Sequence, residues 1–163
     1  MGSLSRQEPV GLLVGAAVRG IKRLVTARAG ALGFTARQYW VLVAILETDA
    51  PSLGALAARL RIDEPTASRV IATLVRRRLV RVEAVPGDRR RTRLCATRKA
   101  EAMRPALLAL AAEIRGTVVA GLPPARQEAL RAGLRHVIAN LEHALFASPV
   151  GRRRPRLDAE DDA

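Results

Sequence analysis

The chain has 163 residues, a formal net charge of +13 and an apolar content of 49%, which is enough for one compact domain with additional dimerisation helices. Aromatic residues are few, which argues against a β-sandwich or barrel, whereas abundant Ala, Leu and Arg favour helices. Cys95 is the only cysteine, so neither an intrachain disulfide nor a cysteine-based metal cluster is expected. The sequence shows no secretory pattern and no apolar run of about 18 residues, so we expect a cytoplasmic protein without a membrane span.

Most of the positive charge lies in one third of the chain. Residues 53–104 contain 14 Arg or Lys and 5 Asp or Glu, which is +9 of the net +13. Such a surface favours a polyanion as partner, either a nucleic acid or an anionic membrane. The alternative is a solvated basic surface without a partner, and the clustering of the charge counts against it.

Two helices are predicted before residue 50. Apolar residues recur at spacings of three and four over residues 9–29, and Gly30 and Gly33 mark the end of this helix. Thr35 is the predicted N-cap of the second helix, which Pro51 ends.

A helix-turn-helix is predicted next. Ser52 caps a short helix that extends to about Leu60, and Asp63 caps a second helix with Pro65 in its first turn. The second helix is predicted to end near Arg78. Its apolar positions lie on one side, and the other side is predicted to expose Thr66, Ser68, Arg69 and Thr73.

A β-wing follows the two helices. Residues 80–84 alternate between apolar and charged, which predicts a strand, and residues 92–96 are predicted to return as a second strand. Residues 86–88 read Pro-Gly-Asp, which is typical of a turn. A helix can enter the major groove of DNA and an arginine-rich hairpin the neighbouring minor groove, so double-stranded DNA is the expected partner.

The remaining chain is predicted to form two further helices. Thr97 caps a long helix that extends to Val118, and a break at residues 121–124 precedes the last helix. That helix has a narrow leucine-rich stripe, typical of packing on a partner helix. Residues 149–163 have no apolar period and are predicted to be disordered. The predicted regions are 1–34 (dimerisation helix), 35–97 (DNA binding), 98–147 (dimerisation helices) and 148–163 (tail).

This order of elements resembles the MarR family of bacterial transcription regulators. The segments that carry the resemblance are residues 35–40, 53–60, 65–74, 79–81, 87–90 and 94–97. The most specific of them is Asp-Arg-Arg at residues 88–90, before a strand and a capping Thr. The sequence departs from the pattern at Arg78 and Ala100, where similar proteins often have Gly, and Arg78 leaves the end of the recognition helix open. The resemblance implies a mainly α fold with a small β-wing, in which dimerisation helices flank a winged helix-turn-helix.

The predicted DNA contacts fall into two groups. Thr66, Ser68 and Arg69 are the base-edge candidates, although Thr66 and Ser68 are also explained by helix capping or a polar surface. Phosphate contacts give affinity that weakens with salt, and their candidates are Arg59, Arg61, Arg76 and Arg77. The predicted helix contacts are Pro65, Thr66, Ser68, Arg69, Thr73 and Arg76.

The resemblance also implies roles for the wing. It places Arg90 in the minor groove, where narrow grooves attract arginine. Asp88, two residues earlier, is expected to brace Arg90, and Arg89 and Arg91 are expected to take flanking phosphates.

The resemblance further implies a homodimer and, in many members, a cleft for small aromatic acids. Arg37 is the candidate partner for a carboxylate, with Tyr39 and Trp40 beside it. The alternative is ordinary core packing with an exposed arginine. For the apolar helix faces, the alternative to a dimer is an all-monomer helical core.

We therefore expect a homodimeric, sequence-specific DNA-binding transcription regulator, a ligand-responsive repressor on a pseudo-palindromic operator. The alternatives are a sequence-tolerant nucleoid-associated DNA binder and a protein-interaction module whose wing binds an acidic partner. No catalytic motif indicates an enzyme, and no cofactor is expected. His136 and His143 are seven residues apart and are interpreted as dimer-helix residues, so no metal site is expected.

Overall fold

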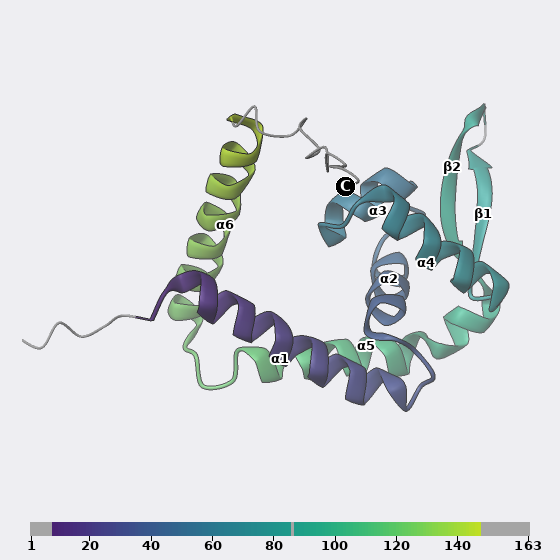
Figure 1. The fold of residues 1–163 in the computed structure, drawn as a ribbon. Helices are drawn as coiled ribbons and strands as arrows, with labels where there is room; N and C mark the ends of the chain where they lie inside the picture. The colour runs from purple at the N-terminus through teal and green to yellow at the C-terminus, as the bar shows by residue number, and fades with distance from the viewer. Residues whose placement is uncertain (1–7, 86, 148–163) are drawn as a thin grey trace, which may run out of the picture. The chain divides into compact units, whose positions relative to one another are not determined.

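The computed structural model describes residues 8–85 and 87–147. The chain forms two compact units, divided between Val118 and Val119. The elements of the first unit are α1 (Val10–Gly30), α2 (Ala36–Glu47), α3 (Leu53–Leu60), α4 (Glu64–Arg76), β1 (Val80–Val85), β2 (Asp88–Ala96) and α5 (Arg98–Val118) (Figure 1). The second unit contains α6 (Pro124–Ala147). The fold is mainly α with one small sheet, as the sequence predicts.

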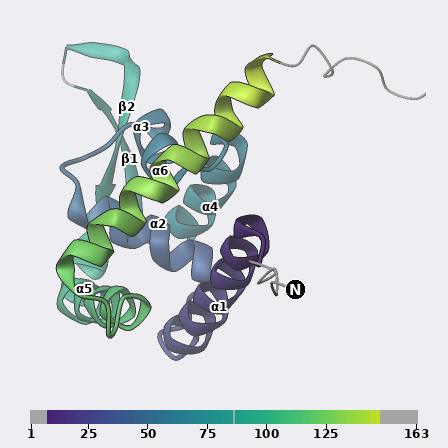
Figure 2. The ribbon, with the colours of Figure 1, turned by 90° about the vertical axis from the view of Figure 1, so that its left-hand side faces the viewer.

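The core of the first unit is built around α2. Seven of its residues are buried, and the helix contacts α1, α3, α4, α5 and β2. The helices α1 and α5 lie side by side (Figure 1 and Figure 2), and Arg28 of α1 forms an ion pair with Glu113 of α5 at 3.4 Å. Because α2 is covered on so many sides, it fixes the positions of α3, α4 and β2 relative to α1 and α5.

The helices begin where the sequence predicts. The Thr35 side chain accepts from the Gln38 amide and the Gln38 side chain accepts from the Thr35 amide, each at 3.2 Å, so the two form a capping box. Ser52 Oγ accepts from the Ala55 amide at 3.2 Å. Thr97 Oγ1 accepts from the Ala100 amide at 3.3 Å. These caps are confirmed.

The wing is an antiparallel pair of strands in which Val80 pairs with Ala96 and Glu83 pairs with Arg93. The prediction that the second strand begins at residue 92 was wrong, because pairing extends back to Asp88. An arginine-rich segment shows no alternation of apolar residues, although its backbone forms the ladder equally well. The Leu94 amide donates to Pro51 O at 2.9 Å, which attaches the root of the wing to the segment before α3.

The second unit is a helix without a core of its own. None of the α6 residues whose burial is described is buried, and Leu130, Leu134, Leu141 and Leu145 are all exposed. Glu128 forms ion pairs with Arg131 and Arg135 on the same helix. The predicted disordered segment, residues 149–163, lies outside the described residues.

Candidate nucleic-acid interface

The helix α4 has one buried and one exposed face. Ala67, Ile71 and Leu74 are buried in the core. Removing the Leu74 side chain beyond Cβ would cost about 2–5 kcal/mol of stability, so this face firmly anchors the helix. Ser68 and Arg69 lie on the exposed face, as predicted. The helix therefore presents a polar surface from a fixed position.

Both ends of α4 are closed by hydrogen bonds. At the start, Asp63 Oδ1 accepts from the Thr66 amide at 2.7 Å, and hydrogen bonds from the Thr66 side chain and amide lower the pKa of Asp63. At the end, the Arg78 amide donates to Val75 O and the Leu79 amide to Leu74 O, which is a Schellman motif. The N-cap and the position of Pro65 are confirmed.

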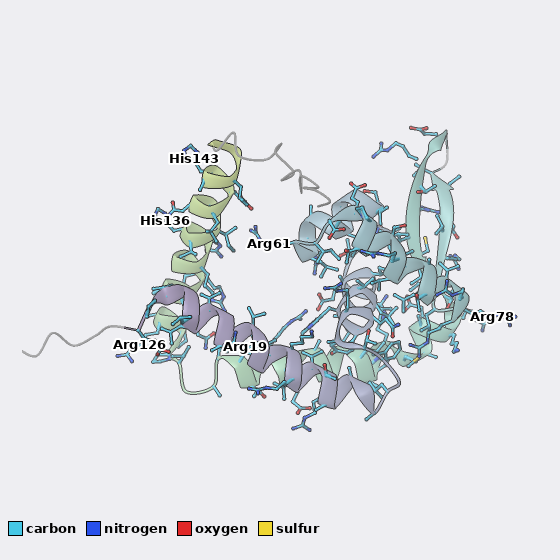
Figure 3. The ribbon with its side chains drawn as sticks, viewed as in Figure 1. Arg19, Arg61, Arg78, Arg126, His136 and His143 are labelled. Carbon is cyan, nitrogen blue, oxygen red and sulfur yellow. The ribbon has the colours of Figure 1, made fainter. Side chains whose placement is uncertain are left out.

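Two non-glycine residues adopt left-handed backbone conformations at the turns on either side of α4. Arg61 has a φ of 50° in the turn after α3, and Arg78 has a φ of 58° after α4 (Figure 3). This conformation costs a non-glycine residue roughly 1–2 kcal/mol. The end of this helix, which the sequence left open, is at Arg76, two residues before Arg78.

Hydrogen bonds connect the polar side chains along α4. Arg69 Nε donates to Pro65 O at 3.3 Å and Arg69 Nη2 donates to Thr66 Oγ1 at 3.1 Å. Thr73 Oγ1 donates to Arg69 O and accepts from Arg76 Nη2, both at 3.1 Å. The expectation that Thr66 is exposed was wrong: it is only 7% exposed, and Arg69 folds back onto the first turn to donate to its hydroxyl.

Two of the arginines expected at phosphates, Arg59 and Arg77, contact residues at least twelve positions away in the chain. Arg59 forms an ion pair with Glu47 at 2.9 Å. Arg77 is half-buried, with its guanidinium over the Phe34 ring and hydrogen-bonded to the Gln38 side chain. None of these partners is close in sequence to its arginine, so the apolar periodicity of the helices did not predict the contacts.

At the root of the wing, Glu83 is shared by three groups. Arg81 Nε lies at 2.5 Å from one carboxylate oxygen, and the other accepts from Arg93 Nη2 at 3.0 Å and from Cys95 Sγ at 3.4 Å. Hydrogen bonds from Cys95 and Arg81 lower the pKa of Glu83, whereas burial and the neighbouring Glu83 raise the pKa of Cys95. The carboxylate thus fixes two arginines and keeps the thiol protonated.

The tip of the wing carries the remaining predicted contacts. Gly87 has a φ of 84° in the turn, which glycine adopts without strain. Asp88 is half-buried and Arg91 is exposed. The backbone of Arg89 and Arg90 lies in β2, but their side chains lie outside the described part of the structure. The brace between Asp88 and Arg90 therefore stays a prediction.

The winged helix agrees with the comparison of this sequence with known families. Residues 32–91 match the model of the MarR family. Over this region the chain is similar to MarR-family proteins. The matched segment begins before α2, contains α3, α4 and β1, and ends within β2, so it includes the recognition helix and the tip of the wing.

Solved structures extend the similarity to most of the chain. Bordetella bronchiseptica BpsR, whose DNA binding is regulated by 6-hydroxynicotinic acid, is 29% identical, with a TM-score of 0.70 over 83% of this chain and 97% of that one. A probable transcriptional regulator from Pseudomonas aeruginosa is 28% identical, with a TM-score of 0.66 over 80% and 97%. CouR from Rhodococcus jostii RHA1, solved with p-coumaroyl-CoA, shares the fold at 23% identity, with a TM-score of 0.73 over 83% and 95%. None of the curated proteins matches the chain.

A cavity of about 650 Å³ lies between α1, α2 and α4. Lys22, Arg37 and Arg69 supply its cationic groups, and Phe34 and Val70 contribute apolar surface. Arg37 thus lies where an anion could enter, as the sequence suggests.

The other two predicted ligand residues do not line this cavity. Tyr39 is fully buried, and its hydroxyl donates to Leu107 O at 2.9 Å. Burial raises the pKa of Tyr39 to about 12, so its hydroxyl keeps its proton. Trp40 packs edge-on against Tyr39, with ring centroids 5.1 Å apart. Both side chains contact α5, Tyr39 through Leu107 and Trp40 through Arg115, whose Cζ lies 5.9 Å from the Trp40 ring centroid, which supports the alternative of core packing.

Within residues 8–85 and 87–147, no three His, Cys, Asp or Glu side chains are grouped to hold a metal ion. His136 and His143 project from the same side of α6 (Figure 3). No helix there is both long and apolar enough to cross a membrane.

Proposed function

We propose that this MarR-family transcription regulator binds specific sites in double-stranded DNA as a homodimer and acts as a repressor. The observation that carries the proposal is the attachment of α4 and the wing to each other. Thr97 Oγ1 donates to Arg78 O at 2.8 Å and the Thr97 amide donates to Leu79 O at 3.1 Å, which joins the end of β2 to the end of α4. The recognition helix and the wing can therefore meet adjacent grooves as one body.

In this proposal α4 enters the major groove. Ser68 and Arg69 reach base edges, and Arg69 exchanges its hydrogen bonds to Pro65 and Thr66 for a guanine. Pro65, Thr66 and Thr73 shape and support that surface, and Arg76 binds a phosphate. The wing places Arg90 in the minor groove, with Arg89 and Arg91 on phosphates and Asp88 as the brace.

We propose that a second copy covers the exposed apolar faces. Leu12 and Val18 of α1 are 62% and 59% exposed, and Leu141 and Leu145 of α6 are 60% and 78% exposed. Burying such surface stabilises association by roughly 25 cal/mol per Å². Residues 1–34 and 98–147 then serve dimerisation and residues 35–97 DNA binding. Two recognition helices in successive major grooves require half-sites about 10 base pairs apart.

We propose a small anionic effector for the cavity. The regulation of BpsR by an aromatic carboxylic acid supports this class of ligand, as do Lys22 and Arg37 at the cavity. Arg69 belongs both to the cavity and to the exposed face of α4, so an anion bound to it competes with DNA. A ligand changes the equilibrium only if it binds the two conformations unequally.

The proposal is tested by selection from sheared genomic DNA at physiological salt. We expect the recovered fragments to share a pseudo-palindrome with half-sites about one helical turn apart. Recovery of fragments without a shared site would favour a sequence-tolerant nucleoid-associated protein, which the +9 charge of residues 53–104 also supports. An acidic protein that duplex DNA cannot displace from the wing would instead indicate a protein-interaction module.

A further inference from the structure

Arg77 follows the last residue of α4, yet its side chain turns towards the protein. Its Cζ lies 4.4 Å from the centroid of the Phe34 ring, and its Nη1 donates to Gln38 Oε1 at 3.3 Å. A planar guanidinium that stacks on a ring and donates sideways to an amide has a defined orientation, which a lysine in its place would lack. The contact therefore fixes the orientation of the guanidinium as well as the position of its charge.

Both partners of Arg77 are themselves held in place. Phe34 is 3% exposed, and its amide donates to Ala29 O at 3.1 Å around Gly33, which has a φ of 74°. Gln38 Oε1 also accepts from the Thr35 amide in the capping box of α2. Arg77 therefore connects the end of the recognition helix to the junction of α1 and α2.

We propose that Arg77 is a positioning residue that holds α4, through Phe34 and Gln38, in the orientation that meets the major groove. This inference rests on the proposed DNA binding and gives Arg77 a different role from a phosphate contact. Phe34 and Gln38 also line the cavity between α1, α2 and α4. An occupant of the cavity therefore touches the same two side chains that orient the recognition helix.

The test measures binding to a duplex recovered by the genomic selection, at several salt concentrations, well below the melting temperature. Arg77→Lys keeps the charge and Arg77→Met removes it, and we expect both to raise the Kd about five- to tenfold, since neither restores the stacked guanidinium and its hydrogen bond to Gln38. Phe34→Leu is expected to have a similar effect, and the Arg77→Met/Phe34→Leu double variant to lose little more, because both changes remove one contact. The slope of log Kd against log salt should stay at the wild-type value.

Arg76→Met is the matched control, since Arg76 is the exposed neighbour on the same turn. A phosphate contact there would lower the salt slope by about one. The proposal is overturned if Arg77→Lys binds like the wild type, or if Arg77→Met lowers the salt slope by about one. A lower melting temperature with unchanged Kd would also overturn it, because Arg77 would then contribute only stability.

A second measurement separates this inference from the proposed function. If the wild-type protein binds no duplex, the proposed function fails, and amide hydrogen exchange tests the positioning role alone. We expect Arg77→Met to speed exchange over residues 74–79 relative to Arg76→Met. Equal exchange in the two variants would contradict the positioning role.

Discussion

The recognition helix and the wing are both basic, but they are held in different ways. The helix α4 has a buried face, closed ends and arginines that are hydrogen-bonded to the protein at residues 69, 76 and 77. The wing consists of two strands that pair only with each other, and it is attached at its root through Pro51 and Thr97. Even at the root, Val82 beside Glu83 is already 50% exposed.

This difference separates two ways of reading DNA. Base-edge contacts need donors at defined positions, which a helix anchored by its buried face and closed at both ends supplies. Insertion of arginine into a narrow minor groove depends on charge and tolerates adjustment of the hairpin. We therefore expect substitutions in α4 to change sequence discrimination and substitutions at the wing tip to change affinity for every sequence.

The largest effect is expected from Arg69→Ala. Loss of a bidentate arginine–guanine contact should reduce the preference for the selected site by about 1–3 kcal/mol, or roughly 30-fold at the centre of that range. The measurement is competition between the selected duplex and the same duplex with one base pair changed in each half-site. Arg76→Ala is the matched control and should weaken both duplexes equally. A uniform loss of affinity in Arg69→Ala would indicate that Arg69 contacts a phosphate. The helix α4 would then contribute affinity for every sequence, as expected of the wing.

Arg90→Ala should weaken DNA binding at least tenfold, or about 1.4 kcal/mol, because it removes the charge proposed for the minor groove. Fluorescence anisotropy with the selected duplex measures the affinity, and sedimentation checks that the dimer stays intact. The preference between the two competing duplexes should remain at its wild-type value. An unchanged affinity would remove the wing from the interface.

The helix caps of this structure and the turn of the wing were predictable from the sequence. The caps at Thr35, Ser52 and Asp63 follow from short polar side chains placed directly before apolar periodic segments. The glycine turn of the wing was found in the same way. These features depend on neighbours three or four residues away, so a single sequence contains the information.

The features that were missed depend on contacts between distant segments or on side-chain conformation. Arg77 meets Phe34 and Gln38, which are about 40 residues away in the chain. Thr66 is covered by an arginine that helical periodicity places on the exposed side. Tyr39 lies on α2, where seven residues are buried, so the helix has too little exposed surface for an amphipathic pattern to show which side faces a cavity.

A smaller effect, about fivefold, is expected from Glu83→Gln in the root of the wing. Burial raises the pKa of Cys95, and the Glu83 carboxylate raises it further by accepting its hydrogen bond and by its charge, while Arg93 and Arg81 lower it. Without the carboxylate, the pKa of Cys95 should fall and its thiolate fraction rise, so alkylation by iodoacetamide at pH 7.4 should be about five times faster. Glu101→Gln is the control, because its carboxylate is bound to Arg104. Equal alkylation rates in the wild type and Glu83→Gln would mean that Glu83 does not organise the root.

The smallest effect concerns the fixed start of α4. Asp63→Ala removes the N-cap and should lower the melting temperature by about 3 °C at neutral pH. Hydrogen bonds from Thr66 lower the pKa of Asp63 below its ordinary value of 3.8. A carboxyl group whose pKa is lowered on folding stabilises the protein above the unfolded pKa, and this contribution is lost as the pH falls through the folded value. The difference in melting temperature between the wild type and Asp63→Ala should therefore be full at pH 5 to 7 and shrink below about pH 4.

Asp63→Asn separates the charge from the cap, because an amide oxygen still accepts from the Thr66 amide. This variant should keep most of the neutral-pH stability and change little below pH 4. If neither variant is destabilised at any pH, the charge and the cap hydrogen bond contribute nothing measurable. The start of α4 would then be held by its buried face alone, and the contrast with the wing would rest on packing and on the contacts of Arg77.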